Sequence, residues 1–235
     1  MNRLFFSHGD KGGVGKSMVS AVMVDYLLTQ GKIVGVIEGD LAADIAMRFA
    51  NSVDIQAVDL NRAGDRERAV MGFVDALDAL QGHDVVVNLP AGSSETLEEL
   101  ADVLVAGAES VGFDTHVFYA LGHQHAATAR ALRSVETGLV NAVPGNRRCM
   151  VFPAFLGQPE KYDWVKSGAR DKYNIQEIVM PAIRPDDLVI KVLEFPGPFS
   201  SMLGTDSPLT LGERLMLQKK WLKPAFDAVS IFDEG

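Results

Sequence analysis

The residues with the clearest chemistry form a glycine-rich loop near the N-terminus, residues 11–17, with the sequence KGGVGKS. Glycines in such a loop allow successive backbone N–H groups to turn toward an anion. A lysine in the position of Lys16 can reach the terminal phosphates of a nucleotide, and a hydroxyl in the position of Ser17 can hold Mg²⁺. The residue types and their spacing therefore predict a phosphate-binding loop.

The segments on either side of the loop support this prediction. The apolar run Leu4–Ser7 is typical of a buried strand, and Lys16–Gln30 has the pattern of an amphipathic helix. A helix that starts at the loop points the partial positive charge of its N-terminus at a bound phosphate. The alternative, an ordinary glycine turn beside a surface lysine, does not account for this order of strand, loop and helix.

The rest of the chain alternates between short apolar runs and helical patterns. We expect further strands at residues 33–37, 85–89, 117–120, 149–152 and 175–180, with an edge strand within 54–60. We expect helices at residues 65–80, 95–108 and 124–137, then an irregular crossing rich in proline and glycine from 181 to 208, and a final helix from about Thr210. This order predicts a doubly wound α/β fold with a mostly parallel sheet, helices on both faces and a single domain over residues 1–235.

Composition narrows the classes of protein. A chain of 235 residues that is 47% hydrophobic can bury a sizeable core, and its net charge of −9 opposes nucleic acid unless a basic patch acts locally. The single cysteine, Cys149, excludes an intramolecular disulfide and a multi-cysteine metal or iron–sulfur site within one subunit. The start Met1–Phe6 is too short for a signal-peptide core, and no later run is long enough to span a membrane, so we expect a cytoplasmic protein.

The loop resembles the deviant phosphate loop of the MinD/ParA superfamily of ATPases. Asp10 stands where the usual phosphate loop has glycine, and Lys11 is a second lysine that ordinary loops lack. The resemblance implies ATP and Mg²⁺ as cofactors and an ATP-dependent homodimer in which Lys11 reaches the partner's nucleotide. The nucleotide would contact Lys11, Gly12, Gly13, Val14, Gly15, Lys16, Ser17 and Met18.

The resemblance also assigns acidic positions after the second expected strand. Asp40 matches the aspartate of the family's first switch, which orients the attacking water, so Lys11, Lys16 and Asp40 would be the catalytic residues. The alternative for Asp40 is a cap on the helix that follows. Asp44 matches a switch carboxylate in some branches only, and its role stays open.

Asn88 departs from the family pattern, because the strand before Pro90-Ala91-Gly92 ends in aspartate elsewhere. An amide oxygen can accept a hydrogen bond from a metal-bound water but brings no charge. We hypothesise that Glu38, on the same strand face as Asp40, supplies that charge, so that Ser17 holds Mg²⁺ with Asp40, Glu38 and Asn88 acting through water. The alternative is a neutral replacement without consequence. Slow hydrolysis is the expected result.

The resemblance places the base between the ends of the last two strands, at Phe152–Phe155 and Met180–Ile183. Phe152 and Phe155 have core packing as an equal alternative. No asparagine follows Phe152 to read the base, so the preference for ATP over GTP rests on the resemblance alone.

The late segment, residues 178–214, looks like the plasmid-borne branch associated with conjugation and plasmid stability. We therefore expect a dimerising ATPase that acts in plasmid or DNA maintenance, partition or conjugative transfer through an unidentified partner protein, with any DNA contact local or indirect. One alternative is a nucleotide-loaded scaffold with little or no hydrolysis. Another is a membrane-recruited positioning switch that uses Leu215–Phe232, although Pro224 and the acidic residues there favour a helix packed on the core over stable membrane insertion.

Overall fold

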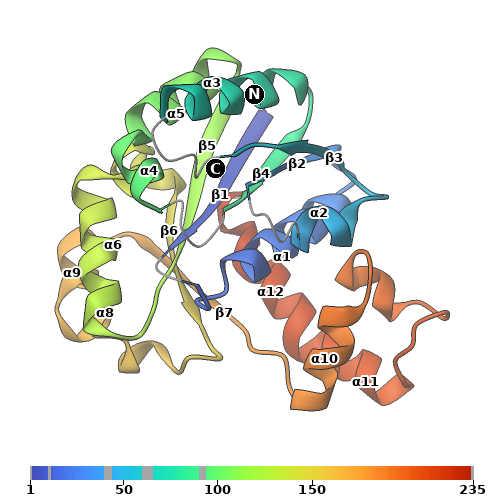
Figure 1. Cartoon of the computed structure of the whole chain (residues 1–235). Coiled ribbons are helices and arrows are strands. Elements are labelled where there is room, and N and C mark those ends of the chain that lie inside the picture. The colour runs from blue at the N-terminus through green and yellow to red at the C-terminus, as the bar shows by residue number, and fades with distance from the viewer. Residues whose placement is uncertain (1, 10–11, 40–43, 60–65, 90–93, 234–235) are drawn as a thin grey trace.

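The computed structural model describes residues 2–9, 12–39, 44–59, 66–89 and 94–233. They form a three-layer α/β fold in which helices cover both faces of one sheet (Figure 1). One face carries α3, α5 and α6, and the other carries α1, α2 and α12. The predicted fold class is confirmed.

The sheet has seven strands in the order β3-β2-β4-β1-β5-β6-β7, and every pairing is parallel. The strands are β1 (Asn2–Gly9), β2 (Val34–Glu38), β3 (Asp54–Ala57), β4 (Asp84–Asn88), β5 (Phe113–Ala120), β6 (Arg148–Pro153) and β7 (Gln176–Met180). All the strands expected from the sequence are present, and the edge strand β3 is shorter than the run that suggested it. Because β1 lies in the middle of the sheet, the loop that follows it opens at the centre of the carboxyl edge, where ligands of open α/β sheets bind.

The helices lie where the periodic patterns predicted, with corrections at several points. They are α1 (Lys16–Thr29), α2 (Asp44–Phe49), α3 (Arg66–Ala79), α4 (Ser94–Glu99), α5 (Ala101–Ser110), α6 (His125–Thr137), α7 (Leu139–Ala142), α8 (Asp163–Lys166), α9 (Ala169–Tyr173), α10 (Asp186–Glu194), α11 (Leu211–Met216) and α12 (Lys223–Val229). Short 3₁₀ turns are η1 (Gly145–Arg147), η2 (Pro159–Lys161), η3 (Phe199–Leu203) and η5 (Ser230–Phe232), and η4 (Leu217–Leu222) is a π-helical turn.

Two helix predictions need correction. The expected helix at residues 95–108 is two helices, because Leu100 leaves the helical conformation with φ −109° and ψ 13°, and no proline or glycine marks that break. Helix α1 is buried on nearly all sides and not amphipathic: every residue from Val19 to Leu27 is buried. The reason is that α2, η3 and α12 pack over its outer side.

The crossing after β7 was expected to be irregular, and it contains a helix. Helix α10 begins directly after Pro185 and ends shortly before Pro196, so the two prolines bound the helix and do not interrupt it. Its apolar residues Leu188 and Val192 are buried. The next helix, α11, has a capping box in which the Thr210 hydroxyl accepts from the Glu213 N–H and the Glu213 carboxylate accepts from the Thr210 N–H.

The C-terminal segment packs on the core, as the sequence favoured. The buried residues of this segment are Leu217, Trp221, Leu222, Ala225 and Val229, and α12 contacts both α1 and β7. Pro224 lies in the first turn of α12, immediately after the π-helical turn η4. A wider turn before a proline relieves the clash with the carbonyl four residues earlier. Within the described residues, no helix is both long enough and apolar enough to cross a bilayer.

Candidate functional site

The phosphate loop joins the central strand to α1. Strand β1 ends at Gly9, and α1 begins at Lys16 with the Val19 N–H bonded to the Gly15 carbonyl at 3.0 Å. Gly13 and Gly15 both have φ +88°, a conformation that disfavours any other residue. The loop therefore needs glycine at these two positions, as the sequence predicted.

Side chains below the loop hold the start of α1 in place. The Ser7 hydroxyl donates to the Lys16 carbonyl at 2.8 Å, and both residues are buried. Val14 is buried, Ser17 and Met18 are half-buried, and Gly12 and Gly13 are exposed. The predicted contact residues from Gly12 to Met18 thus lie together at the carboxyl edge of the sheet. Asp10 and Lys11 lie outside the described residues.

Glu38 and Asn88, which the sequence paired in a hypothesis, are in contact. They end the adjacent strands β2 and β4 and lie opposite each other in the register. The Asn88 Nδ2 donates to Glu38 Oε1 at 2.8 Å, and the Ala46 N–H of α2 donates to Glu38 Oε2 at 3.1 Å. Both residues are buried, at 0% exposed for Asn88 and 5% for Glu38. Asp40 and the turn Pro90-Ala91-Gly92 lie outside the described residues.

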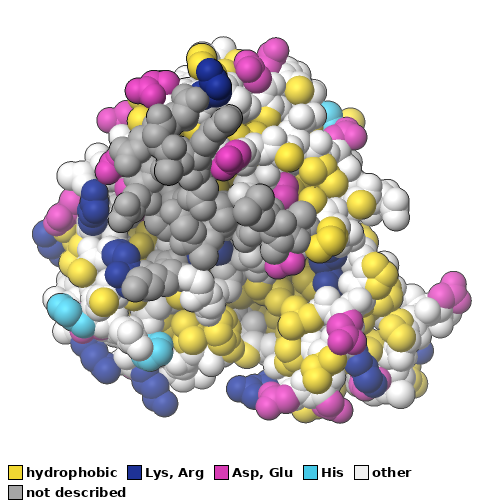
Figure 2. Space-filling view, viewed as in Figure 1, with side chains coloured by type: hydrophobic (Ala, Val, Ile, Leu, Met, Phe, Trp, Pro, Cys, Tyr) yellow, Lys and Arg dark blue, Asp and Glu magenta, His cyan; other side chains and the backbone are white. Residues whose placement is uncertain are grey.

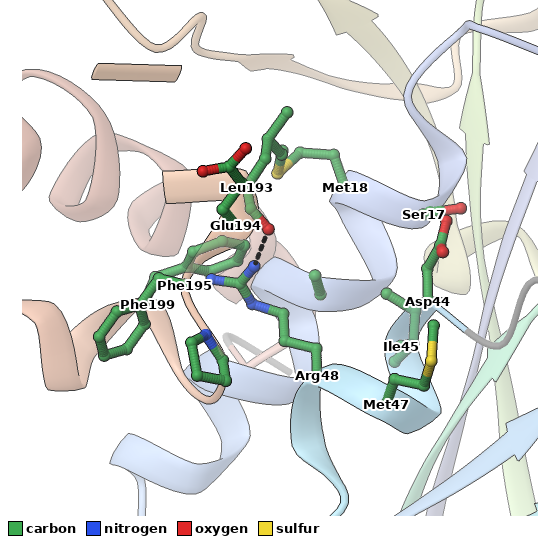
Figure 3. A pocket seen from close by; sticks show the side chains of 12 residues that line it. Ser17, Met18, Asp44, Ile45, Met47, Arg48, Leu193, Glu194, Phe195 and Phe199 are labelled. Atoms are coloured by element: carbon green, nitrogen blue, oxygen red, sulfur yellow. Dashed lines mark hydrogen bonds between the residues drawn. The ribbon is translucent and has the colours of Figure 1, made fainter. Parts of the chain in front are cut away.

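A cavity of about 500 Å³ opens on the Ser17 side of the loop, which we call the Ser17 cavity. Ser17 and Asp44 line the same cavity and lie on the same side of it in Figure 3. Asp44 is the first residue of α2. The opposite wall comes from the end of α10 and the segment after it, including Leu193 and Phe195. Asp44, which the sequence offered beside Asp40 as a switch carboxylate, therefore lines the same cavity as Ser17, the predicted metal ligand.

Arg48 joins the two walls of the Ser17 cavity. Its guanidinium donates to the carbonyls of Val192 at 3.0 Å and Leu193 at 3.3 Å, and lies 3.9 Å from the centre of the Phe199 ring (Figure 3). Burial lowers the Arg48 pKa to about 10, although the nearby Asp25 carboxylate opposes this shift. Helix α2 is therefore tied to α10 and η3, which the sequence did not predict.

A second cavity, of about 380 Å³, lies on the other side of the loop, and we call it the Phe155 cavity. It is lined by Gly13 and Gly15 and by the ends of both β6 and β7, where the base was expected. Hydrophobic side chains gather in a hollow at the lower middle of the face in Figure 2. The two phenylalanines considered for this region differ in their environment. Phe152 is buried against Tyr162, whereas Phe155 is 51% exposed and lines the cavity.

One polar pair beside the loop, His8 and Glu98, was not predicted from the sequence. His8, the residue before Gly9, is buried, and its Nε2 lies 2.6 Å from Glu98 Oε1 in α4. Glu98 also accepts from the Leu139 N–H at 2.9 Å. Burial raises the pKa of Glu98, but the hydrogen bond and charge of His8 outweigh it and hold that pKa below its usual value. A lone histidine in a strand and a glutamate in a helix give no sequence signal for such a contact.

Among the described residues, no three His, Cys, Asp or Glu side chains gather in a way that would hold a metal ion. Mg²⁺ in nucleotide sites is held by substrate phosphates, waters and one or two protein ligands. The Ser17 hydroxyl, in the first turn of α1, suits that kind of site.

Comparison with known proteins supports the fold. The chain superposes on the MinD cell division protein of Aquifex aeolicus with a TM-score of 0.57 and 15% identity, over 99% of this chain and 98% of that one. It matches a putative plasmid partition protein of Borrelia burgdorferi, solved with AMPPNP, with a TM-score of 0.57 and 13% identity, over 99% and 98%. The MinC:MinD complex of A. aeolicus gives 0.54 and 17%, over 98% and 93%.

The match found by sequence covers a smaller part of the chain than the structural matches do. Protein MobD of Acidithiobacillus ferrooxidans is 28% identical over 102 residues, which is 43% of this chain and 43% of MobD. The match therefore spans less than half the length of that relative. No family model matches the chain. The chain thus resembles MinD and ParA-type partition proteins and has their fold.

Proposed function

We propose that this chain is a nucleotide-dependent switch of the MinD/ParA type, which binds ATP with Mg²⁺ through residues 11–18 and dimerises when loaded. The observation that carries the proposal is the loop between β1 and α1, where Gly13 and Gly15 have φ +88° and Lys16 begins the helix at the carboxyl edge of the sheet. Backbone N–H groups at a helix N-terminus, with a lysine beside them, bind phosphates.

Each side of the loop contributes one part of the proposed site. The Phe155 cavity is mostly apolar and suits the base, which stacks well on an aromatic ring. The Ser17 cavity contains the hydroxyl for Mg²⁺ and lies beside α2, which follows the segment that carries Asp40. In the proposal, Asp40 orients the attacking water and Lys11 acts across the dimer, as the family resemblance implies. Bound Mg²⁺ would neutralise phosphate charge.

We place the role of the switch in plasmid or DNA maintenance, through a partner protein. Support comes from the plasmid partition protein that shares the fold and from the partial match to MobD. The adjacent arginines Arg147 and Arg148 are a candidate basic patch for DNA. Direct binding through them is disfavoured, because Arg147 pairs with Asp114 at 2.7 Å and Arg148 donates to the Val143 and Asn141 carbonyls. The membrane-recruited alternative is disfavoured, because five apolar residues of the C-terminal segment, from Leu217 to Val229, are buried in the core, although Leu215 and Met216 are 55% and 41% exposed.

The proposal is tested by nucleotide binding and by oligomeric state. A fluorescent ATP analogue should bind the wild type, and Lys16→Ala should weaken binding by about 100-fold because the phosphates lose a charged donor. The matched control is Lys32→Ala, which removes an exposed lysine beyond the other end of α1 and should bind as the wild type does. In light scattering, ATP should give a dimer in the wild type and a monomer in Lys11→Ala. A wild type that stays monomeric with ATP would overturn the switch.

Asn88 favours a second candidate, a nucleotide-loaded scaffold with little or no hydrolysis, because the resemblance implies an aspartate at this position and an amide brings no charge to a bound Mg²⁺. Single-turnover measurements separate the two candidates. Release of phosphate from bound ATP supports a slow ATPase, whereas ATP recovered intact from the loaded dimer after hours supports the scaffold.

A further inference from the structure

The His8–Glu98 pair lies at the end of β1, just before the phosphate loop. Side chains alternate along a strand, so Ser7 and His8 face opposite sides of the sheet. On one side the Ser7 hydroxyl donates to the Lys16 carbonyl at 2.8 Å, and on the other the His8 ring lies 2.6 Å from the Glu98 carboxylate of α4. The residue that holds the start of α1 is therefore the direct neighbour of the residue that Glu98 contacts.

The end of β1 has little free space around it. Gly9 has φ +155°, and a Cβ there would lie 2.5 Å from the Ala120 carbonyl oxygen of β5. The His8 ring is 2% exposed and packs edge-on against Tyr119, with ring centroids 5.2 Å apart. Because packed groups leave no room to absorb a displacement, a shift of the group that holds His8 is passed to the backbone that enters the loop.

The second oxygen of Glu98 is held where α6 meets α7. The Leu139 N–H donates to Glu98 Oε2 at 2.9 Å, and the Ser134 hydroxyl bonds to the same carboxylate. A Cβ at Gly138 would lie 1.5 Å from Glu98 Oε2, and its next contact would be the Ser134 Cα at 3.0 Å. Gly138 is extended, with φ −111° and ψ −150°. Glycine is therefore needed at this position mainly because the Glu98 carboxylate fills the space of a side chain.

Helix α4 is not a continuation of α5, because Leu100 between them leaves the helical conformation. Leu97 anchors α4 in the core on the face that also carries α6 (Figure 1). Glu98 adds the polar contacts to β1 and to the α6–α7 junction. A purely structural role, in which Glu98 only holds α4 in place, is the competing explanation. Such a role would change stability alone, whereas a role in the loop would also change nucleotide affinity.

We propose that Glu98 is a positioning residue for the phosphate loop, which holds the end of β1 through His8 and has its own support at Gly138 and Leu139. This role rests on the proposed nucleotide binding and adds a residue outside the loop and outside both cavities. A loop whose ends are held in advance loses less conformational freedom when a phosphate binds. Loss of the Glu98 contacts should therefore weaken nucleotide binding although no group on the nucleotide is removed.

The first test measures affinity for a fluorescent ATP analogue well below the Tm of each variant. Glu98→Ala should bind about fivefold more weakly or worse. Glu98→Gln should stay within about threefold of the wild type, because its oxygen can accept from Leu139 while its amide donates to the other tautomer of His8. Asp84→Ala is the matched control, since it removes a carboxylate that pairs with Arg3 at the amino ends of the strands and should lower the Tm without changing affinity.

The second test acts from the far side of Glu98. Gly138→Ala changes no charged group, but its methyl group displaces the carboxylate, so affinity should again fall about fivefold. In the Glu98→Ala background the same substitution should change affinity by less than about twofold, because the carboxylate is absent. Gly107→Ala is the matched control. Its methyl group would meet Val74 Cγ2 at 2.7 Å between α5 and α3, and it should leave affinity unchanged.

Hydrogen exchange gives a readout at the junction itself. Coupling between two sites is reciprocal, so a nucleotide in the loop should strengthen the hold on α7. Exchange of the amides of residues 138–142 should slow about threefold or more when the wild type binds the ATP analogue. In Glu98→Ala the nucleotide should leave the exchange of these amides unchanged.

The outcomes separate this role from the function on which it rests. A wild type that binds no nucleotide overturns the proposed function and, with it, the role of Glu98. A wild type that binds, with Glu98→Ala and Gly138→Ala lowering the Tm but keeping their affinity within about twofold, overturns only the role of Glu98. Losses that add in the double variant also contradict it. Gly138→Ala decides the question if Glu98→Ala does not fold.

Discussion

The two ends of the central strands differ in how their polar groups are paired. At the amino ends, the Asp84 carboxylate accepts from the Arg3 N–H at 3.0 Å and from its guanidinium at 2.7 and 3.2 Å. Arg3 also bonds to Asp233 near the C-terminus. At the carboxyl ends, Asn88 Oδ1 has no partner in the described part of the chain, and Gly15 has a positive φ.

The difference indicates what each end contributes. At the amino ends, charged groups that pair with one another hold β1 and β4 to the C-terminal segment. A polar group without a partner and a backbone turned inward lower stability unless something binds there. The amino ends should therefore control stability, and the carboxyl ends should control nucleotide binding. Three predictions test this division, from the largest expected effect to the smallest.

Asp84→Ala should cost about 2–4 kcal/mol in the free energy of unfolding, because it leaves the Arg3 N–H and guanidinium without their main acceptor. Urea denaturation measures this loss. In the absence of urea, the nucleotide affinity of this variant should stay within about twofold of that of the wild type. Asp54→Ala is the control, since its pair with His83 has a carboxylate 71% exposed and should contribute less than about 1 kcal/mol. Equal losses in the two variants would contradict the division.

His116 should make stability depend on pH at the same end. Burial, only partly opposed by its bond to the Asp114 carbonyl, lowers the His116 pKa to about 4, with Arg147 and Arg3 adding to the shift. In the unfolded chain His116 takes up a proton below about pH 6.5, but in the folded chain only near pH 4. The contribution of the neutral, buried ring to stability is therefore fully present above pH 6.5 and is lost as the pH falls toward 4. The loss should reach about 2–3 kcal/mol.

Replacing His116 by phenylalanine should remove this dependence while keeping the ring contacts with Phe5 and Phe232. Denaturation curves at pH 7.5, 6, 5 and 4 measure the slope in both proteins. A slope in His116→Phe as steep as in the wild type would show that other groups cause the loss.

Phe155→Ala should weaken binding of the ATP analogue about tenfold, because an aromatic wall of the cavity beside Gly15 is lost. The Tm should change little, since the ring is 51% exposed. Met71→Ala, which removes a side chain of α3 that is 58% exposed, is the matched control and should leave affinity unchanged. If both variants bind alike, the base does not occupy this cavity.

Much of the fold of this molecule could be predicted from local sequence patterns. Buried strands and a glycine loop before a helix have strong signatures, because φ +88° at Gly13 and Gly15 and continuous apolar runs restrict the residue types that fit. Weaker signals gave the errors. Proline and glycine suggested an irregular crossing where α10 lies, since a proline just before a helix and one after it look the same as prolines in a loop.

The sequence by itself determined the α/β class, the order of the strands along the chain and the loop from Gly12 to Ser17, because these depend on residues close together in the chain. Only the tertiary structure decided which distant groups meet. It brought Asn88 to 2.8 Å from Glu38, His8 to 2.6 Å from Glu98, and Arg48 to the carbonyls of α10. Strand order and helix packing set these contacts across 50, 90 and 144 residues, and no local preference encodes a pairing at that separation.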